Sequence, residues 1–173
     1  MNANSQVTSI CKRPVIALLY SRLKPSNCQM PRFFSVFEAE RLLPEVEGLL
    51  RSLLQLKDDY QRTQTELHRF LQQISVAGGM IPPRDKISQL RNRKDAAARG
   101  LQTSLEKLEE IGCLLKDIDT GLVDFPTLYH GKEVYLCWKL GETNIAYWHR
   151  VEDGFPGRQP IDPEFLAEHR GDA

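Results

Sequence analysis

The sequence lacks any apolar run long enough to cross a lipid bilayer. A membrane-spanning helix needs about 20 predominantly apolar residues, and the longest such run near the N-terminus covers only residues 15–20. The chain also lacks an excess of charge, because its 23 basic residues equal its 23 acidic ones. We therefore expect no membrane partner and no whole-molecule attraction to nucleic acid.

Cysteines and the common catalytic motifs are also scarce. The four cysteines lie at positions 11, 28, 113 and 137. No pair has the C-x-x-C spacing of a zinc site, and four are too few for a disulfide framework. Glycine-rich phosphate loops and the nucleophile elbow of hydrolases are missing. The sequence therefore predicts reduced thiols in the cytoplasm, no cofactor, no metal ligands and no catalytic residues of a familiar enzyme class.

The first 29 residues differ from the rest because they contain no acidic residue. Their apolar stretch lies directly behind Pro14 and is too short for a secretory signal peptide. Two interpretations are open for residues 1–32: a disordered basic tail, or a start codon assigned too far upstream, with Met30 as the true initiator. The basic residues concerned are Lys12, Arg13, Arg22 and Lys24.

Residues 33–162 are predicted to form a single α+β domain, mainly α-helical, with a long antiparallel helical hairpin over residues 33–120. Ser35 and Glu38 have the spacing of a capping box, which starts a helix. Pro44 cannot donate a helical hydrogen bond, so we expect a short first helix that ends before it, then a kink or a restart. The apolar residues that follow recur in steps of three and four, as in a coiled-coil seam. They are Val46, Leu49, Leu53, Leu56, Tyr60, Leu67, Phe70 and Ile74.

A second helix is predicted from Asp85, a suitable N-terminal cap, to the turn at residues 119–121. Glycine and proline pairs in residues 75–83 predict a loop between the helices. The second seam has the same spacing, with Ile87, Leu90, Ala97, Leu101, Leu108, Ile111, Leu115 and Ile118 as its apolar members. Each of two such helices buries only one face, so the hairpin requires either the strand module or a second copy of the chain. A homodimer is therefore one expectation.

Residues 121–162 are predicted to form a small antiparallel β-hairpin module near the base of the helices. Segments 133–139 and 144–150 are rich in Val, Ile, Tyr and Trp. Gly141 and Glu142 between them suit a two-residue hairpin turn.

The register of this hairpin decides which side chains share a face. A symmetric hairpin pairs Tyr135 with Trp148 on one face and places Cys137 and His149 on opposite faces. Cys137 and His149 should then share no metal ion and form no nucleophile and base pair. Tyr135 and Trp148 would form an exposed partner-binding patch, unless residues 122–125 cover them as a third strand.

Four polar residues are candidates for binding a small ligand: Asp124, Glu142, His149 and Arg158. Arg158 could clamp a carboxylate or phosphate group, or it could pin its own loop to Asp124 or Glu142. His149 could serve instead as a structural side chain that hydrogen-bonds to Asp124 or to a backbone carbonyl.

Five segments occur in an order that points to a known family. They are FSVFEAERLLP at residues 34–44, GLVDFP at 121–126, LCWKLGE at 136–142, WH at 148–149 and GFPGRQP at 154–160. Over about residues 33–162 the chain resembles a bacterial domain-of-unknown-function family, numbered 2203. The resemblance implies a soluble bacterial protein and no established activity. Residues 163–173 lie beyond it, and we expect them to form a peripheral tail.

The start of the second helix is basic. Its positive residues are Arg84, Lys86, Arg91, Arg93, Lys94 and Arg99. We interpret them as a solvated helix face opposed by Glu66 on the first helix, and we do not expect nucleic acid binding.

Together, these features favour a non-catalytic protein-interaction or scaffold module, which would bind a protein partner or itself through its helical seams and its aromatic strand face. The alternative is a small-molecule or metal-binding protein, with a pocket between the strand module and the helices. The sequence identifies no particular partner, ligand or reaction.

Overall fold

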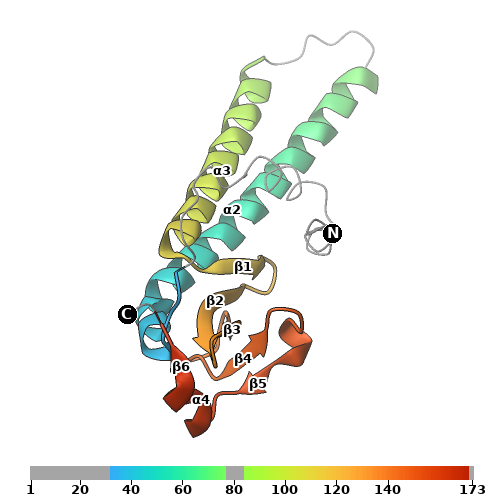
Figure 1. The fold of residues 1–173 in the computed structure, drawn as a ribbon. Helices are drawn as coiled ribbons and strands as arrows, with labels where there is room; N and C mark the ends of the chain where they lie inside the picture. Colours follow the sequence, from blue (N-terminus) through green and yellow to red (C-terminus); the bar gives the residue numbers. More distant parts are fainter. Residues whose placement is uncertain (1–31, 77–83, 172–173) are drawn as a thin grey trace, which may run out of the picture. The chain divides into compact units, whose positions relative to one another are not determined.

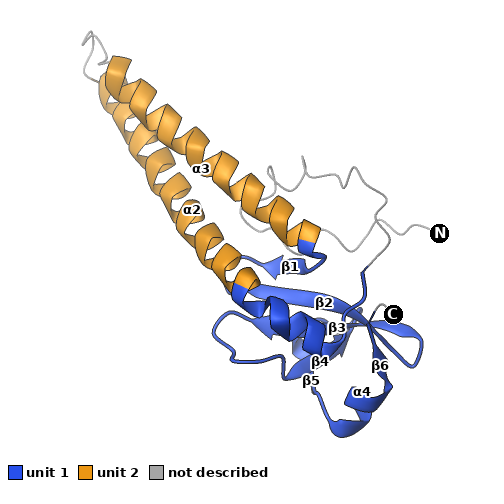
Figure 2. Ribbon diagram, turned by 90° about the vertical axis from the view of Figure 1, so that its left-hand side faces the viewer, with its two compact units in different colours: residues 1–44, 111–173 blue, residues 45–110 orange. Residues whose placement is uncertain are grey.

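The computed structural model describes residues 32–76 and 84–171 of the chain. They divide into two compact units, which have different colours in Figure 2. We call Glu45–Glu110 the arm unit and the remainder the sheet unit. The architecture is α+β and mainly helical, as the sequence predicted.

Two long helices lie side by side in the arm unit (Figure 1). They are α2 (Val36–Val76), which begins in the sheet unit, and α3 (Arg84–Ile111). Gly100 on α3 gives the helices room to approach, because a Cβ atom at this position would lie 3.0 Å from the side chain of Leu56. The predicted helical hairpin is therefore confirmed.

The predicted seam holds in α3 and is displaced in part of α2. In α2, Leu50 and Lys57 are buried, whereas the seam positions Leu49 and Leu56 are only half-buried. A straight helix has 3.6 residues per turn, so a strict 3.5-residue seam drifts around its surface. The buried residues of α3 are Leu90, Ala97, Leu101, Ser104, Leu105 and Leu108.

Helix α2 begins at its capping box and continues through Pro44. The backbone N–H of Ser35 donates to Glu38 Oε2 (2.8 Å), and the backbone N–H of Glu38 donates to Ser35 Oγ (3.3 Å). The predicted break at Pro44 is wrong. An interior proline costs about 3 kcal/mol, but Leu43 and Val46 beside it are buried, and each such side chain contributes about 1.5–3 kcal/mol.

Helix α3 ends at Ile111, seven residues before the end of the predicted seam at Ile118. Gly112 follows with φ of 93°, a left-handed conformation that terminates helices. The chain then forms strand β1 (Leu114–Asp117). The second helix was therefore predicted too long, because Leu115 and Ile118 happen to continue its three-four spacing.

Six strands of the described chain form one sheet, in the order β1-β2-β3-β4-β5, with β6 paired to β2. Strands β2 (Leu122–Tyr129) and β3 (Lys132–Lys139) form a tight hairpin. Its two turn residues, His130 and Gly131, have φ of 50° and 72°, and positive φ at both central positions is typical of such turns. Strand β4 (Tyr147–Arg150) pairs with β3, and β5 (Gln159–Pro160) pairs with β4.

The predicted register of β3 with β4 is wrong by one residue. Leu136 lies opposite Trp148, and Tyr135 lies opposite His149. The connection is longer than a two-residue turn, because β3 ends at Lys139 and β4 begins only at Tyr147. A one-residue slip moves every side chain of a strand to the other face, so β4 presents His149 where Trp148 was expected.

The C-terminal segment packs into the sheet unit and is no peripheral tail. Helix α4 (Pro163–Glu168) contributes Phe165, which is only 1% exposed, and β6 (His169–Arg170) pairs with β2. The imidazole Nε2 of His169 accepts a hydrogen bond of 3.0 Å from the backbone N–H of Val36. Since the first N–H groups of a helix have no partner within it, His169 helps to cap α2.

No helix in the described parts of the chain combines the length and the apolar character needed to cross a bilayer. The expectations for the N-terminal segment and for the loop at residues 77–83 lie outside the described residues.

Candidate metal-binding site

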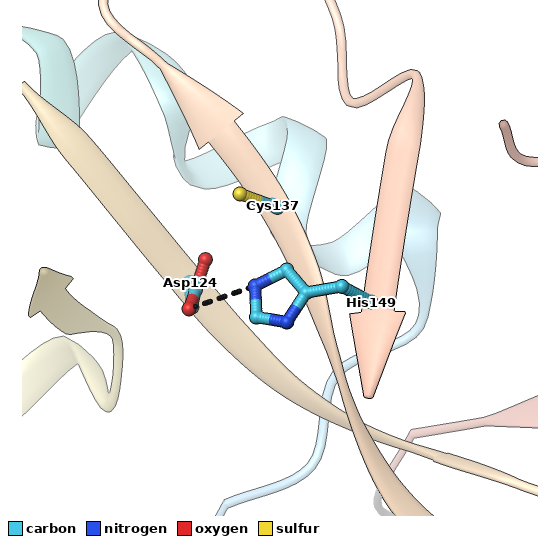
Figure 3. Close-up of side chains that lie close together, drawn as sticks. All are labelled: Asp124, Cys137 and His149. Carbon is cyan, nitrogen blue, oxygen red and sulfur yellow. Dashed lines mark hydrogen bonds and ion pairs between the residues drawn. The ribbon is translucent and has the colours of Figure 1, made fainter. Parts of the chain in front are cut away.

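Three side chains from neighbouring strands converge on one face of the sheet (Figure 3). Asp124 on β2 lies directly opposite Cys137 on β3, and His149 projects from β4 on the same face. Their ligand atoms all lie within 4.8 Å of one another, and each residue is at most 2% exposed. The prediction that Cys137 and His149 lie on opposite faces is wrong, because it depended on the incorrect register.

His149 is held by a hydrogen bond at each ring nitrogen. Its Nδ1 lies 2.7 Å from the Arg150 carbonyl oxygen, which can only accept, so Nδ1 carries a proton. Its Nε2 lies 3.1 Å from Asp124 Oδ2. Burial alone lowers the pKa of His149, but the hydrogen bonds to Asp124 and to the Arg150 carbonyl outweigh burial and raise this pKa above 6.5. These are the two structural partners that the sequence suggested for His149.

Asp124 is a buried carboxylate with one unused oxygen. Its Oδ2 contacts His149, and it also lies 3.6 Å from the Nζ atom of Lys116. Its Oδ1 has no hydrogen-bond partner among the described residues. A buried polar atom without a partner costs about 1–3 kcal/mol, so this oxygen is a position where a further ligand would be stabilising.

Cys137 is a buried free thiol rather than an activated nucleophile. Burial, followed by the charge of Asp124, raises its pKa to about 12, although Arg158 acts in the opposite direction. Both ring nitrogens of His149 have other partners, so the imidazole is not placed to act as a base toward the thiol. The cluster therefore lacks the geometry of a Cys-His-Asp hydrolase site.

Arg158 connects Glu142, the remaining candidate ligand-binding residue, to this cluster. Its Nε donates to Cys137 Sγ (3.2 Å), and its Nη2 donates to the Cys137 carbonyl oxygen (3.3 Å). Both terminal nitrogens also donate to the carboxylate of Glu142, at 2.7 and 3.2 Å. The guanidinium lies over the rings of Tyr147 and Phe155, at 5.0 and 4.5 Å. Of the two predicted roles for Arg158, the structure contains the ion pair to Glu142.

Tyr135 and Trp148 lie on opposite faces of the sheet, and both are buried. Tyr135 lies beside the cluster, where its ring meets His149 edge to face at 5.7 Å. Trp148 stacks on Phe165 at 4.9 Å. The predicted exposed aromatic patch is therefore wrong. Residues 122–125 do pair with β3 as a third strand, but the ring of Trp148 is covered by Tyr129 and Phe165.

The sequence missed two members of this site. Cys137 was excluded from a shared site with His149 because the predicted register was incorrect. Lys116 was predicted to lie in the second helix, but it lies on β1, with its Nζ atom 4.4 Å from the centre of the Tyr135 ring. No local signal marks Lys116, because its position depends on the end of α3 at Gly112. Cys137 lies in the motif LCWKLGE, but only the strand register brings it to Asp124 and His149.

The fold and the site define a small α+β protein with a buried Asp-Cys-His cluster on an antiparallel sheet. The family model described as an uncharacterized conserved protein, DUF2203, matches residues 32–161, and the chain belongs to that family. No curated protein and no solved structure matches the chain.

Proposed function

We propose that the protein binds a divalent transition metal ion, by its donor chemistry Zn²⁺, through Asp124, Cys137 and His149. The convergence of a carboxylate, a thiol and an imidazole within 4.8 Å carries this proposal. These are the three side-chain donors that zinc sites use. Thiolate and imidazole together favour zinc over the oxygen-binding cations Ca²⁺ and Mg²⁺.

The surroundings of the cluster resemble the outer shell of metal sites. A metal-binding histidine usually donates its second ring N–H to a carbonyl or carboxylate, and Nδ1 of His149 contacts the Arg150 carbonyl oxygen in this way. The sulfur of Cys137 accepts a hydrogen bond from Arg158, which favours a thiolate. Asp124 Oδ2 lies near Lys116, while Oδ1 is unpartnered among the described residues.

Metal binding requires modest movement and a loss of protons. Zinc bonds of about 2.0–2.3 Å place tetrahedral ligand atoms about 3.5 Å from each other. His149 Nε2 and Asp124 Oδ2 are already 3.1 Å apart, so only the more widely separated donors must approach, by about 1 Å. The ion replaces the proton between His149 and Asp124 and the thiol proton of Cys137. Three protein ligands leave a fourth position for water or a small ligand.

This proposal corresponds to the metal-binding alternative rather than to the interaction module. The interaction module depended on an exposed aromatic face, and the residues of that face are buried. The helical seams remain as the other predicted partner-binding surface, but their central residues are buried within the arm unit.

The test is a cobalt titration of the full chain with Cys11 and Cys28 replaced by serine, reduced and stripped of metal. Co²⁺ bound to a thiolate gives a charge-transfer absorption in the near ultraviolet, so we expect a band that saturates at one ion per chain. Zn²⁺ should abolish the band by displacing cobalt. The variants Cys137→Ser and His149→Gln should weaken binding at least about tenfold, as loss of a ligand implies.

Cys113→Ser is the matched control, because Cys113 is also a buried cysteine but lies outside the cluster. It should keep the band, and circular dichroism should show that every variant is folded. A missing band in the parent protein, or a band that survives Cys137→Ser, would contradict the proposed metal site.

A further inference from the structure

Charge is segregated along the arm unit. The half formed by residues 60–76 and 84–99 carries eight basic and three acidic residues. The half formed by residues 45–59 and 100–110 carries three basic and seven acidic residues. The neutral charge of the whole chain therefore conceals a basic half and an acidic half within one helical hairpin, and the basic half can attract an anionic partner.

Three arginines form a row on the exposed side of α3. Arg84, Arg91 and Arg99 are all exposed, and their spacings of seven and eight residues keep them within about 80° of one another around the helix axis. At 1.5 Å per residue the row extends about 22 Å. We call these three residues the arginine row.

The arginine row is not neutralised by the first helix. Glu66, the acidic residue expected to oppose it, forms its salt bridge with Lys86 at 2.8 Å. None of the three arginines forms a salt bridge with a described residue. Asp95 lies in the same row, so the row retains a net positive charge.

The chemistry of this surface fits a phosphate backbone better than a protein surface. Protein interfaces depend on buried aromatic and large apolar anchors, and α3 has no large exposed apolar side chain. Exposed Ser88 and Asn92, which can donate to phosphate and sugar oxygens, accompany the arginines. Arginine also binds phosphate oxygens bidentately.

We infer that the basic half of the arm unit binds the phosphate backbone of nucleic acid through the arginine row. Such contacts release counterions, so the logarithm of affinity falls with the logarithm of salt concentration by about 0.9 for each phosphate neutralised on a B-form duplex. This binding reads no base sequence. It is independent of the metal site, which belongs to the sheet unit.

The test measures fluorescence anisotropy of short labelled duplex RNA and duplex DNA with the full chain over a series of salt concentrations. Two double variants remove the same charge: Arg91→Gln with Arg99→Gln in the row, and Arg51→Gln with Lys107→Gln in the acidic half. Both variants keep the four basic residues of the N-terminal segment, residues 1–29. The first should weaken binding about tenfold or more and reduce the salt slope by about two, whereas the second should leave both quantities near the parent values.

Two outcomes would overturn the inference. One is a parent protein that binds neither duplex at low salt, including the case in which it binds only anionic lipid vesicles. The other is an equal loss of affinity in both double variants, because net charge rather than the row would then control binding. If the parent protein binds, comparing its affinities for the RNA duplex and for the DNA duplex shows which nucleic acid supplies the phosphate backbone.

Discussion

Glu38 gives the start of α2 a charged hydrogen bond that acid should remove. Its carboxylate accepts from the backbone N–H and the hydroxyl of Ser35, and these bonds lower its pKa below the ordinary value of 4.5. The stabilisation is complete when the pH is above the ordinary pKa of Glu38. It is lost as the pH falls through the lowered pKa of the folded protein. The free energy of unfolding should therefore decrease in that acid range.

Glu38→Gln isolates this effect, because glutamine can accept the same bonds without titrating. Urea unfolding of both proteins between neutral and acid pH should show the parent more stable at neutral pH, and the difference should disappear in acid. A difference that does not change with pH would show that the charge of Glu38 contributes nothing to the cap.

At the candidate site, local patterns predicted pairs of residues but not the cluster. The partners of His149 and the loop-pinning role of Arg158 follow from what an imidazole and a guanidinium require when they are buried. Membership of Cys137 depended on the strand register, which no single residue determines. The longer connection of residues 140–146 is stabilised by the Trp138 Nε1–H, which donates to the Glu142 carbonyl oxygen at 3.0 Å, and this contact has no sequence signature.

Among the elements, the end of α3 depends on a single glycine. Gly112 has φ of 93°, and a Cβ atom there would lie 3.3 Å from Phe34 and 3.4 Å from Arg32. Gly112→Ala should lower the free energy of unfolding by about 1–2 kcal/mol, the cost of a left-handed conformation for a residue with a side chain. Urea unfolding of the variant and the parent provides the measurement.

Gly48→Ala is the matched control, because Gly48 lies inside α2 with open space around its missing Cβ atom. Alanine should stabilise that helix by about 0.5–1 kcal/mol. If both alanine substitutions proved stabilising, Gly112 would not be what ends α3.

Helix prediction was reliable where several local signals agreed. The capping box of Ser35 and Glu38 predicted where α2 begins, and the three-four spacing of apolar residues predicted two long helices. Pro44 and Ile118 misled, because the burial of Leu43 and Val46 overrides the proline, and a conformational stop at Gly112 overrides a continuing apolar pattern. The first depends on tertiary packing, and the second depends on one left-handed glycine whose stop signal outweighs the apolar spacing.

At the scale of the whole molecule, the chain contains two units with different chemistry. The sheet unit gathers a thiol, an imidazole and carboxylates in its interior, and the arm unit carries its charge on its surface. The composition, with equal numbers of basic and acidic residues, hid both features. The buried cluster becomes visible only when residues are assigned to a face of the sheet, and the charge segregation only when they are assigned to one half of the helical hairpin.

The last elements of the chain complete the sheet unit that the first elements begin. Phe165 of α4 stacks on Trp148 of β4 and contacts Tyr129 of β2 at 4.8 Å. His169 follows it and caps the first turn of α2. Phe165→Ala should therefore lower the free energy of unfolding by about 3–5 kcal/mol, as expected for a buried phenylalanine, with a matching fall in the melting temperature of the sheet unit.

Leu166→Ala tests an exposed side chain of the same helix, because Leu166 is 50% exposed. That substitution should change stability by less than about 0.5 kcal/mol, so thermal unfolding of the two variants separates a packed element from a tail. Limited proteolysis should cleave the Phe165→Ala protein, but not the Leu166→Ala protein, faster than the parent near the C-terminus. Equal and small effects of both substitutions would mean that the C-terminal segment adds nothing to the sheet unit and that His169 caps α2 without the support of Phe165.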